Sequence, residues 1–259
     1  MQDVQNQVAI VTGGGSGMGQ IIAKRLADRG AKVAIFDVNE DGMATTATHS
    51  ATIKAYRCDI SQSEGVNAAV AQVIADLGPV DLLVHAAALM PSHKLVDETH
   101  EGMERLFQIN YFGTVYMVRA VLDGMMERNS GRIIAFGSIA GEVPVPHMGA
   151  YCATKAAVNT YMEVLENELR NTNIHTHLVC PPAVNTPLID QTLATDSPGS
   201  IIESKEAGRL ADPEKIIDAI EKGVAKNKGT IYPGEAWFLM LWHTLFPKLW
   251  WKVVLKFED

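Results

Sequence analysis

A short apolar run near the amino terminus leads directly into a glycine-rich loop. Residues 8–11 are branched and apolar, as in a buried parallel strand, and residues 12–19 read Thr-Gly-Gly-Gly-Ser-Gly-Met-Gly. We expect a helix over residues 20–29, ended by Gly30. In this order the missing β-carbons let backbone N–H groups approach a pyrophosphate, and the helix N-terminus adds partial positive charge. A plain tight turn is the alternative for the loop.

The next predicted strand, residues 32–37, ends on a carboxylate. At this position Asp37 is placed to bond the ribose hydroxyls of NAD and to repel the additional phosphate of NADP. A helix cap or a solvated loop residue is the alternative for Asp37. The order of strand, glycine loop, helix, strand and carboxylate favours a nucleotide site whose cofactor is NAD.

Strands and helices are expected to alternate along the chain. We predict strands at residues 7–12, 32–37, 53–58, 80–86, 131–137, 174–180 and 229–232, and helices near residues 18–29, 63–77, 101–128, 150–171 and 213–227. This alternation predicts the α/β class, a doubly wound parallel sheet of about seven strands with right-handed crossovers and helices on both faces in three layers. No linker divides the sequence, so we expect one domain over residues 1–259.

Tyr151 and Lys155 are spaced one helical turn apart, and Ser138 stands upstream at the end of an apolar strand. Side chains at positions i and i+4 share a helix face, about 5–6 Å apart at Cβ. A phenol with a pKa near 10 is a poor acid or base at neutral pH, and a neighbouring ammonium lowers that pKa. A serine hydroxyl beside them would hold the oxygen of an alcohol or a carbonyl. Taken alone, the spacing of Tyr151 and Lys155 also arises by chance.

The motifs together resemble the short-chain dehydrogenase/reductase family. The shared residues are Thr12-Gly13-x-x-x-Gly17-x-Gly19, Asn110, Ser138, Tyr151 and Lys155, and the likeness spans residues 8–234. The resemblance implies a Rossmann-type fold with Tyr151 as general acid/base and Ser138 stabilising charge on the substrate oxygen. It also implies that Lys155 holds the nicotinamide ribose, and that Asn110 bends its helix and holds a water near the lysine.

The resemblance further implies a set of cofactor contacts. They are Thr12, Gly13, Gly15, Ser16, Gly17, Met18, Gly19, Asp37, Val38, Asp59, Ile60, Ala86, Ala87, Tyr151, Lys155, Pro181, Val184 and Thr186. Asp59 matches a carboxylate beside the adenine ring, with a cap on the next helix, shared with Ser61, as the alternative.

The chain departs from the family pattern at two places. His85-Ala86-Ala87-Ala88 stands where the family has Asn-Asn-Ala-Gly, and Pro182 replaces a glycine, which fixes φ near −65° and removes an N–H. These departures bear on local stability and cofactor geometry rather than on the chemistry.

Three segments around this centre are expected to form the substrate pocket: residues 88–95, 141–149 and 188–210. We expect residues 186–210 to act as a lid, with a mobile turn at residues 195–200. Residues 143–148 are apolar apart from His147, which would either meet a polar group of the substrate or remain an ordinary surface-loop histidine. The predicted substrate contacts are Ser138, Val145, His147, Tyr151, Pro182 and Leu188.

Charge and cysteine usage narrow the possible partners. The net charge of −8 argues against a nucleic-acid partner. Cys58, Cys152 and Cys180 form an odd set without metal-like spacing, so we expect reduced thiols, no metal and a cytoplasmic setting. Residues 1–7 are polar and lead straight into the first strand, so we expect no signal peptide.

The extension over residues 235–259 is rich in tryptophan. Pro247 splits it into parts that are shorter than the ~20 apolar residues a membrane-spanning helix needs. Pro247 suits a first helical turn, and the helix after it has lysines on one side and apolar residues on the other, which fits a membrane surface, a neighbouring subunit or closure of the pocket. We weigh membrane contact and self-association evenly, and expect a homodimer or homotetramer. The residues concerned are Trp237, Trp242, Trp250 and Trp251, with Lys248, Lys252 and Lys256 opposite Leu249, Trp250, Val253, Val254 and Phe257.

These observations predict an NAD-dependent oxidoreductase that interconverts a secondary alcohol and a ketone by hydride transfer. The apolar pocket segments favour a bulky hydrophobic substrate such as a lipid, steroid, terpenoid or aryl alcohol. A non-catalytic NAD-binding sensor or scaffold on the same fold is the alternative. The complete set of Asn110, Ser138, Tyr151 and Lys155 favours the enzyme, because a scaffold has no chemical need for all four.

Overall fold

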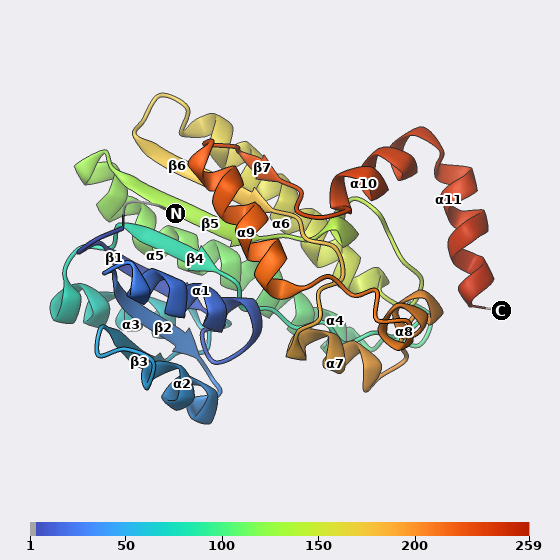
Figure 1. Ribbon diagram of the computed structural model, residues 1–259, viewed down its shortest axis with the longest axis horizontal. Coiled ribbons are helices and arrows are strands. Elements are labelled where there is room, and N and C mark those ends of the chain that lie inside the picture. The colour runs from blue at the N-terminus through green and yellow to red at the C-terminus, as the bar shows by residue number, and fades with distance from the viewer. Residues whose placement is uncertain (1–3, 259) are drawn as a thin grey trace.

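Seven parallel strands form one sheet in the computed structural model, which describes residues 4–258 (Figure 1). Their spatial order is β3-β2-β1-β4-β5-β6-β7, so the chain starts in the middle of the sheet and winds outward in both directions. This arrangement confirms the predicted doubly wound parallel sheet. The strands are β1 (Val8–Thr12), β2 (Lys32–Asp37), β3 (Ile53–Arg57), β4 (Leu82–His85), β5 (Gly131–Phe136), β6 (Ile174–Val179) and β7 (Thr230–Ile231).

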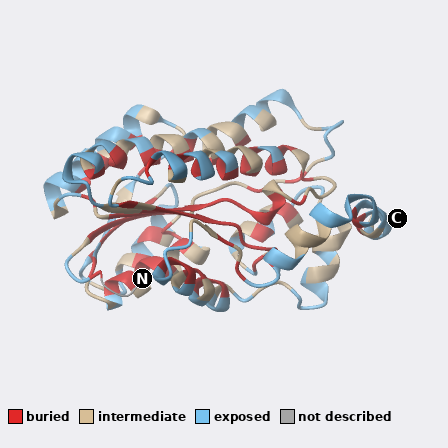
Figure 2. Ribbon diagram, turned by 90° about the horizontal axis from the view of Figure 1, so that it is seen from above, coloured by how far each residue is buried: buried red, intermediate tan, exposed pale blue. Residues whose placement is uncertain are grey.

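Helices cover both faces of the sheet and give the predicted three layers. Figure 2 shows the buried strands between two layers of helices whose outer sides are exposed. Apolar residues of α3, α5 and α6 pack against one face, and those of α1 and α9 against the other. The helices are α1 (Gly17–Asp28), α2 (Glu40–Ala47), α3 (Ser63–Leu77), α4 (His100–Phe107), α5 (Gly113–Arg128), α6 (Gly149–Glu168), α7 (Pro187–Leu193), α8 (Gly199–Glu206), α9 (Pro213–Ala225), α10 (Ala236–Leu245) and α11 (Pro247–Val254).

Strand β1 shows why an uninterrupted apolar run was the right signal. All of its residues are buried, with Ile10 packing into the cluster on one face and Ala9 and Val11 into the cluster on the other. A strand covered by helices on both sides has no solvent-facing residues, so polar and apolar residues do not alternate.

The helix predicted over residues 101–128 is interrupted. Helices α4 and α5 are joined by a π-helical turn over Gln108–Phe112, which contains the buried Asn110. The Thr114 hydroxyl donates to the Asn110 carbonyl at 2.7 Å, a local hydrogen bond that competes with the helix ladder. The extra residue in the turn redirects Asn110 toward the interior. The bend therefore lies where the family resemblance implied it.

The predicted lid and the C-terminal extension both fold into pairs of short helices. Helices α7 and α8 lie within residues 186–210, and α8 begins at Gly199, inside the segment predicted as a turn. Pro247 begins α11, as expected. Of the apolar residues predicted opposite the lysines, Trp250 and Val254 are buried, but Leu249 and Phe257 remain 48% and 43% exposed. Within residues 4–258 no helix is both long and apolar enough to cross a membrane.

Candidate active site

The motifs converge at the carboxyl ends of the strands, where two cavities meet. One, which we call the nucleotide groove, has a volume of about 400 Å³ and is bounded by the glycine loop, the end of β2 and the end of β4. The other, which we call the catalytic cavity, has about 280 Å³ and is bounded by Ser138, Tyr151 and Lys155. They share a wall, so a ligand in the groove can extend into the cavity. The shared residues are Met18, Ala86, Ala88, Thr186 and Leu188.

The glycine loop forms an open cradle at the start of α1. Gly17, the first residue of α1, has φ +53°, a conformation that favours glycine. A β-carbon on Gly19 would overlap the carbonyl oxygen of Gly13, so the loop and the helix can approach this closely only through glycine. The first turn of α1 thus leaves its N–H groups facing the groove. The predicted contacts Gly13, Ser16, Gly17, Met18 and Gly19 all line the groove.

Asp37 joins the end of β2 to the glycine loop. One carboxylate oxygen accepts from the Gly15 N–H at 2.9 Å, and the other accepts from the N–H groups of Val38 and Asn39 at 2.8 and 3.0 Å. The side chain also lines the groove, as Val38 does. Gly15 itself lies outside the groove wall, because its N–H is directed at Asp37. The carboxylate therefore both shapes the loop and borders the site predicted for the ribose.

The predicted adenosine side of the groove is bordered by Asp59, Ile60, Ala86 and Ala87. Asp59 accepts hydrogen bonds from both the N–H and the hydroxyl of Ser61, at 3.0 and 2.7 Å, which hold the turn before α3 but do not cap that helix, whose cap residue is Gln62. Its side chain still borders the groove. The two roles are compatible because a carboxylate offers about four acceptor positions.

Thr12 has a structural position rather than a place in the groove wall. It is fully buried, and its hydroxyl accepts from the N–H groups of Ala86 and Ala87 at 3.1 Å each. Nδ1 of His85 lies 3.0 Å from the same oxygen. Since the oxygen already accepts twice, its own proton is directed at His85. His85, which stands where the family has an asparagine, thus takes part in joining β1 to β4. Its burial is the main reason that its pKa falls to about 3, and the positive charge of Lys155 contributes to the same shift.

Ser138, Tyr151 and Lys155 meet at the catalytic cavity and are all buried. Ser138 follows β5, its hydroxyl accepts from the Ala140 N–H at 3.1 Å, and it lines the same cavity as Tyr151. Lys155 lies one turn beyond Tyr151 on α6. Its ammonium is 5.8 Å from the centre of the phenol ring and donates to the Phe136 carbonyl at 2.8 Å. The strand end and the helix face therefore bring the three side chains together.

Burial governs the titration of this site. It raises the pKa of Tyr151 above its ordinary value, and the hydrogen bond with Ser138 opposes this rise only in part. Burial also lowers the pKa of Lys155 to about 8. The predicted lowering of the Tyr151 pKa by Lys155 is absent here, because the ammonium lies over the ring and bonds a backbone carbonyl instead of the phenol oxygen. The phenol is consequently protonated at neutral pH.

Replacing Lys155 by methionine is expected to raise stability at neutral pH. The pKa of Lys155 falls from 10.5 to about 8 on folding, so the unfolded chain binds more protons between these values. Below about pH 8 the buried Lys155 ammonium therefore lowers the free energy of unfolding by its full amount. This destabilisation fades as the pH rises from about 8 to 10.5. After allowing for the lost bond to Phe136, Lys155→Met should add about 2 kcal/mol to the free energy of unfolding.

Urea unfolding of wild type and Lys155→Met at about pH 7 and about pH 10 measures the difference in their free energies of unfolding. The advantage of Lys155→Met should be smaller at the higher pH. The exposed Lys222 on α9 provides a matched control, since Lys222→Met removes the same charge from solvent. Equal changes in the two variants would contradict the assignment of a destabilising buried charge.

Asn110 holds the surroundings of the site in place. Its side-chain oxygen accepts from the Leu89 N–H at 2.8 Å, and its amide donates to the Leu89 carbonyl at 2.9 Å and to the Thr154 hydroxyl at 3.1 Å. Thr154 lies beside Lys155 on α6. The amide is thus fully used in tying the loop after β4 to the catalytic helix, which makes Asn110 a positioning residue.

The walls of the catalytic cavity come largely from the predicted segments. Val145, Pro182 and Leu188 line it, as do Pro181, Val184 and Thr186 from the segment after β6. His147 does not line it: its Nδ1 lies 3.0 Å from a carboxylate oxygen of Asp196, and its Nε2 lies 3.4 Å from one of Glu258. The loop reverses at His147, whose φ is +61°, and this turns the ring away from the cavity.

Sequence reasoning missed several wall residues. Leu239 and Trp250, from the C-terminal extension, line the catalytic cavity, so closure of the pocket was the alternative that matched their position. Arg105, Ile109 and Gln191 line the nucleotide groove. The cluster of tryptophans in the sequence was a signal that could have pointed to Leu239 and Trp250. No local motif marks the other three, because α4, the π-helical turn and α7 meet only in the folded chain.

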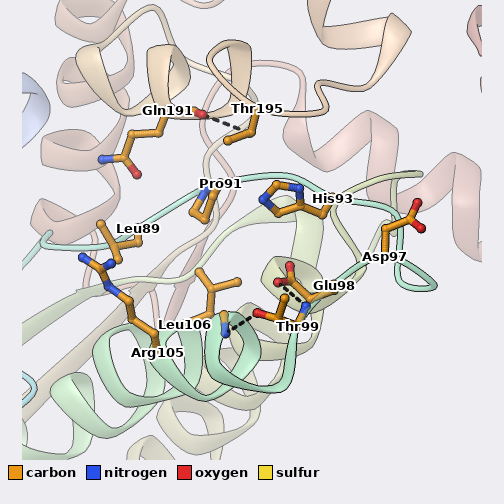
Figure 3. A pocket seen from close by; sticks show the side chains of 11 residues that line it. Leu89, Pro91, His93, Asp97, Glu98, Thr99, Arg105, Leu106, Gln191 and Thr195 are labelled. Atoms are coloured by element: carbon orange, nitrogen blue, oxygen red, sulfur yellow. Dashed lines mark hydrogen bonds between the residues drawn. The ribbon is translucent and has the colours of Figure 1, made fainter.

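A third cavity of about 390 Å³ lies beside the groove. Figure 3 shows it between the loop carrying Leu89 and Pro91, the start of α4 and the end of α7. Leu89, Arg105 and Gln191 belong to both this cavity and the nucleotide groove. None of Ser138, Tyr151 and Lys155 lines it, so it is separate from the acid/base residues.

Known proteins resemble this chain over most of its length. The chain is 31% identical over 226 residues to 2-(S)-hydroxypropyl-CoM dehydrogenase 3 of Xanthobacter autotrophicus, covering 84% of this chain and 89% of that protein. It is 27% identical over 255 residues to estradiol 17-beta-dehydrogenase 11 of Rattus norvegicus, covering 95% and 82%.

A solved structure of a short chain dehydrogenase/reductase from Burkholderia phymatum, in complex with NAD, superimposes with a TM-score of 0.86 at 26% identity. The match covers 96% of this chain and 97% of that one. A family model described as short chain dehydrogenase matches residues 7–197. Since that match takes in the glycine loop, the strands up to β6 and the catalytic helix, this protein belongs to the short-chain dehydrogenase/reductase family of oxidoreductases.

Proposed function

We propose that this protein is an NAD-dependent oxidoreductase that interconverts a secondary alcohol and a ketone, with Tyr151 as the general acid/base. One observation carries the proposal: Ser138, Tyr151 and Lys155 line one largely apolar cavity, and five of its lining residues also line the glycine-loop groove. A cofactor in the groove would place its reactive end beside a proton donor.

The residues of the groove fit a dinucleotide. The glycine loop, whose close approach to α1 a β-carbon on Gly19 would prevent, and the N-terminus of α1 suit a pyrophosphate, and Asp37 suits ribose hydroxyls. The structure of the Burkholderia phymatum relative contains NAD. When bound, the nicotinamide supplies or accepts the hydride.

The protein's own residues then handle the oxygen and its proton. Ser138 donates to the substrate oxygen and Tyr151 exchanges the proton with it, a preorganised pair in a water-poor cavity. The raised pKa keeps Tyr151 protonated at rest, which is the form that ketone reduction uses. Alcohol oxidation requires the phenolate, and Ser138 is the nearby group that favours it by lowering the pKa of Tyr151.

Formation of NADH over a panel of secondary alcohols of increasing bulk tests the proposed activity directly. We expect the bulkier apolar alcohols to react, because the catalytic cavity is lined mainly by apolar residues. These include Met90, Val143, Met148, Ile189, Leu239 and Trp250. Lipid, steroid, terpenoid and aryl alcohols are the classes we propose. Absence of turnover with every member, in both directions, would contradict the assignment.

NAD is expected to bind more tightly than NADP by about tenfold or more, since the Asp37 carboxylate would repel a ribose phosphate. Asp37→Asn keeps an oxygen that can accept from Gly15 but removes the charge, so it should narrow this ratio. Titration of both cofactors against both proteins, followed by fluorescence, measures it. If wild-type protein bound NADP as tightly as NAD, the ribose assignment would be wrong.

We also propose peripheral membrane contact through α10 and α11, in a protein that otherwise works in the cytoplasm as a homodimer or homotetramer. Trp237, Phe238 and Phe246 are 55%, 60% and 55% exposed, and the apolar groove they adjoin is lined by Phe238, Leu241, Trp242, Leu245, Phe246 and Leu249. Exposed Lys248 and Lys252 follow on α11, and exposed Lys256 lies in the turn after it, in a chain of net charge −8. Aromatic anchors with lysines suit an anionic surface.

Sedimentation with vesicles tests this contact. We expect the full chain to sediment with vesicles containing anionic phospholipid, and Trp237→Ser combined with Phe246→Ser to weaken partitioning by about tenfold. The pair Ile74→Ser and Val164→Ser removes comparably exposed apolar side chains from other surfaces and serves as the control. Equal sedimentation of all three proteins would exclude the membrane contact and leave self-association as the use of this surface.

The non-catalytic sensor remains the second candidate. It is disfavoured because Ser138, which has no proposed contact with NAD, is buried at the same cavity as Tyr151 and Lys155, where a polar side chain carries a cost that NAD binding alone does not require.

A further inference from the structure

Trp250 stands apart from its neighbours in the C-terminal extension. Its side chain is 8% exposed, whereas Trp251 beside it is 37% exposed. The indole N–H donates to the Pro144 carbonyl at 3.2 Å, and the ring meets that of Trp242 edge-on at 5.4 Å. A second ring, that of His243, packs edge-on at 6.0 Å. The indole is thus held by one hydrogen bond and two aromatic contacts.

This fixed ring faces the reaction site. Trp250 lines the catalytic cavity and belongs to a buried cluster with Ile139 and Val143. Ile139 directly follows Ser138, so the cluster adjoins the residue that meets the substrate oxygen. Through Trp250, a segment more than a hundred residues downstream of Ser138 becomes part of the cavity wall.

The end of the extension is attached to the lid as well. Glu258 accepts from the Gly199 N–H at 3.1 Å with one carboxylate oxygen and lies 3.4 Å from His147 with the other. A β-carbon on Gly199 would overlap the Phe257 carbonyl oxygen, so the close contact depends on glycine there. Figure 1 shows the end of α11 beside α8. Loop 141–149, α8 and the extension therefore close the cavity together.

We propose that Trp250 is a specificity-determining residue that sets the upper size of the substrate's apolar substituent. This inference deepens the proposed function, since it concerns the same cavity. A ring held at its N–H and on its face cannot swing aside for a longer group as a free side chain would. An apolar chain attached to the carbinol carbon can extend until it meets the indole, and each buried methylene should improve binding about fourfold up to that point.

Binding of 2-alkanones, from 2-butanone to 2-decanone, to the full-length protein provides the test. Isothermal titration calorimetry with wild type should show affinity rising with chain length and then levelling off. In Trp250→Ala the rise should continue to longer ketones, with the longest bound at least about tenfold more tightly than by wild type. Trp251→Ala, which removes an indole that does not line the cavity, should match wild type.

Two more variants guard against a folding defect. Trp250→Phe should give an intermediate limit, and Gly199→Ala, which forces Phe257 and the end of the extension outward, should also move the limit to longer ketones. Three outcomes would each overturn the inference. The chain length at which affinity levels off could stay unchanged in Trp250→Ala and Gly199→Ala, it could shift equally in Trp251→Ala, or wild type could bind no ketone. Turnover measured in parallel separates the two proposals: shifted binding without any turnover would contradict the proposed function and support the role of Trp250.

Discussion

Tyr151→Phe is expected to reduce kcat by about a thousandfold while leaving NADH binding within about twofold of wild type. The phenol is the group proposed to give its proton to the substrate oxygen, and burial, which raises its pKa, keeps it protonated at neutral pH. Phenylalanine keeps the ring and its packing but removes the hydroxyl that bonds Ser138. Steady-state kinetics on a substrate from the alcohol panel, together with a titration of NADH, measures both quantities.

Tyr161 on the same helix provides the matched control. Its ring packs edge-on against Tyr111, with 6.3 Å between ring centres, and it lines neither cavity, so Tyr161→Phe should keep kcat within about twofold. Undiminished turnover in Tyr151→Phe, with NADH still bound, would overturn the acid/base role. An equal loss in Tyr161→Phe would point instead to a general defect of α6.

Gly19→Ala is expected to weaken NADH binding by about a hundredfold, which corresponds to ~2.7 kcal/mol. The added β-carbon would overlap the Gly13 carbonyl oxygen, and that atom belongs to the backbone and cannot rotate away. The loop and α1 must separate, so the N–H groups that face the groove lose their common direction. Fluorescence titration with NADH measures the change, with circular dichroism to confirm that the protein is folded.

Gly65→Ala is the control for adding a methyl group at a glycine. Gly65 lies in the first turn of α3, where a new β-carbon would meet only the Gln62 Cβ at 3.6 Å, an ordinary contact. The Gly65→Ala variant should bind NADH with the affinity of wild type. If Gly19→Ala bound NADH as tightly as Gly65→Ala does, the glycine loop would not be the pyrophosphate site.

Local sequence was enough to predict the sheet, because each strand carries its own signal. Strand β1 is apolar throughout, and the helices on both sides leave no alternation to interpret. The one long helix that was wrong, residues 101–128, failed for a related reason. The π-helical turn contains Asn110, whose side chain bonds Leu89 and Thr154, and both of these lie far away in sequence. Only the family resemblance pointed to it.

The candidate site shows the same division. Tyr151 and Lys155 share a helix face by spacing alone, and the glycine loop follows its strand directly. The side chains of Thr12 and His147 line neither cavity, because their surroundings come from other elements. Thr12 is enclosed by the end of β4, and His147 is turned toward Asp196 and Glu258. No spacing within a segment reports on such neighbours.

The sequence by itself indicated the fold class, since periodicity, turn chemistry and helical spacing act over a few residues. Through the motifs that resemble the short-chain dehydrogenase/reductase family it also indicated the family and the candidate acid/base residues. Only the tertiary structure decided which groups close the cavity and how the site titrates. Trp250 reaches the reaction site from α11, and burial sets the pKa shifts of Tyr151 and Lys155. Cavity walls and desolvation both depend on how distant segments pack together, and that information is not local.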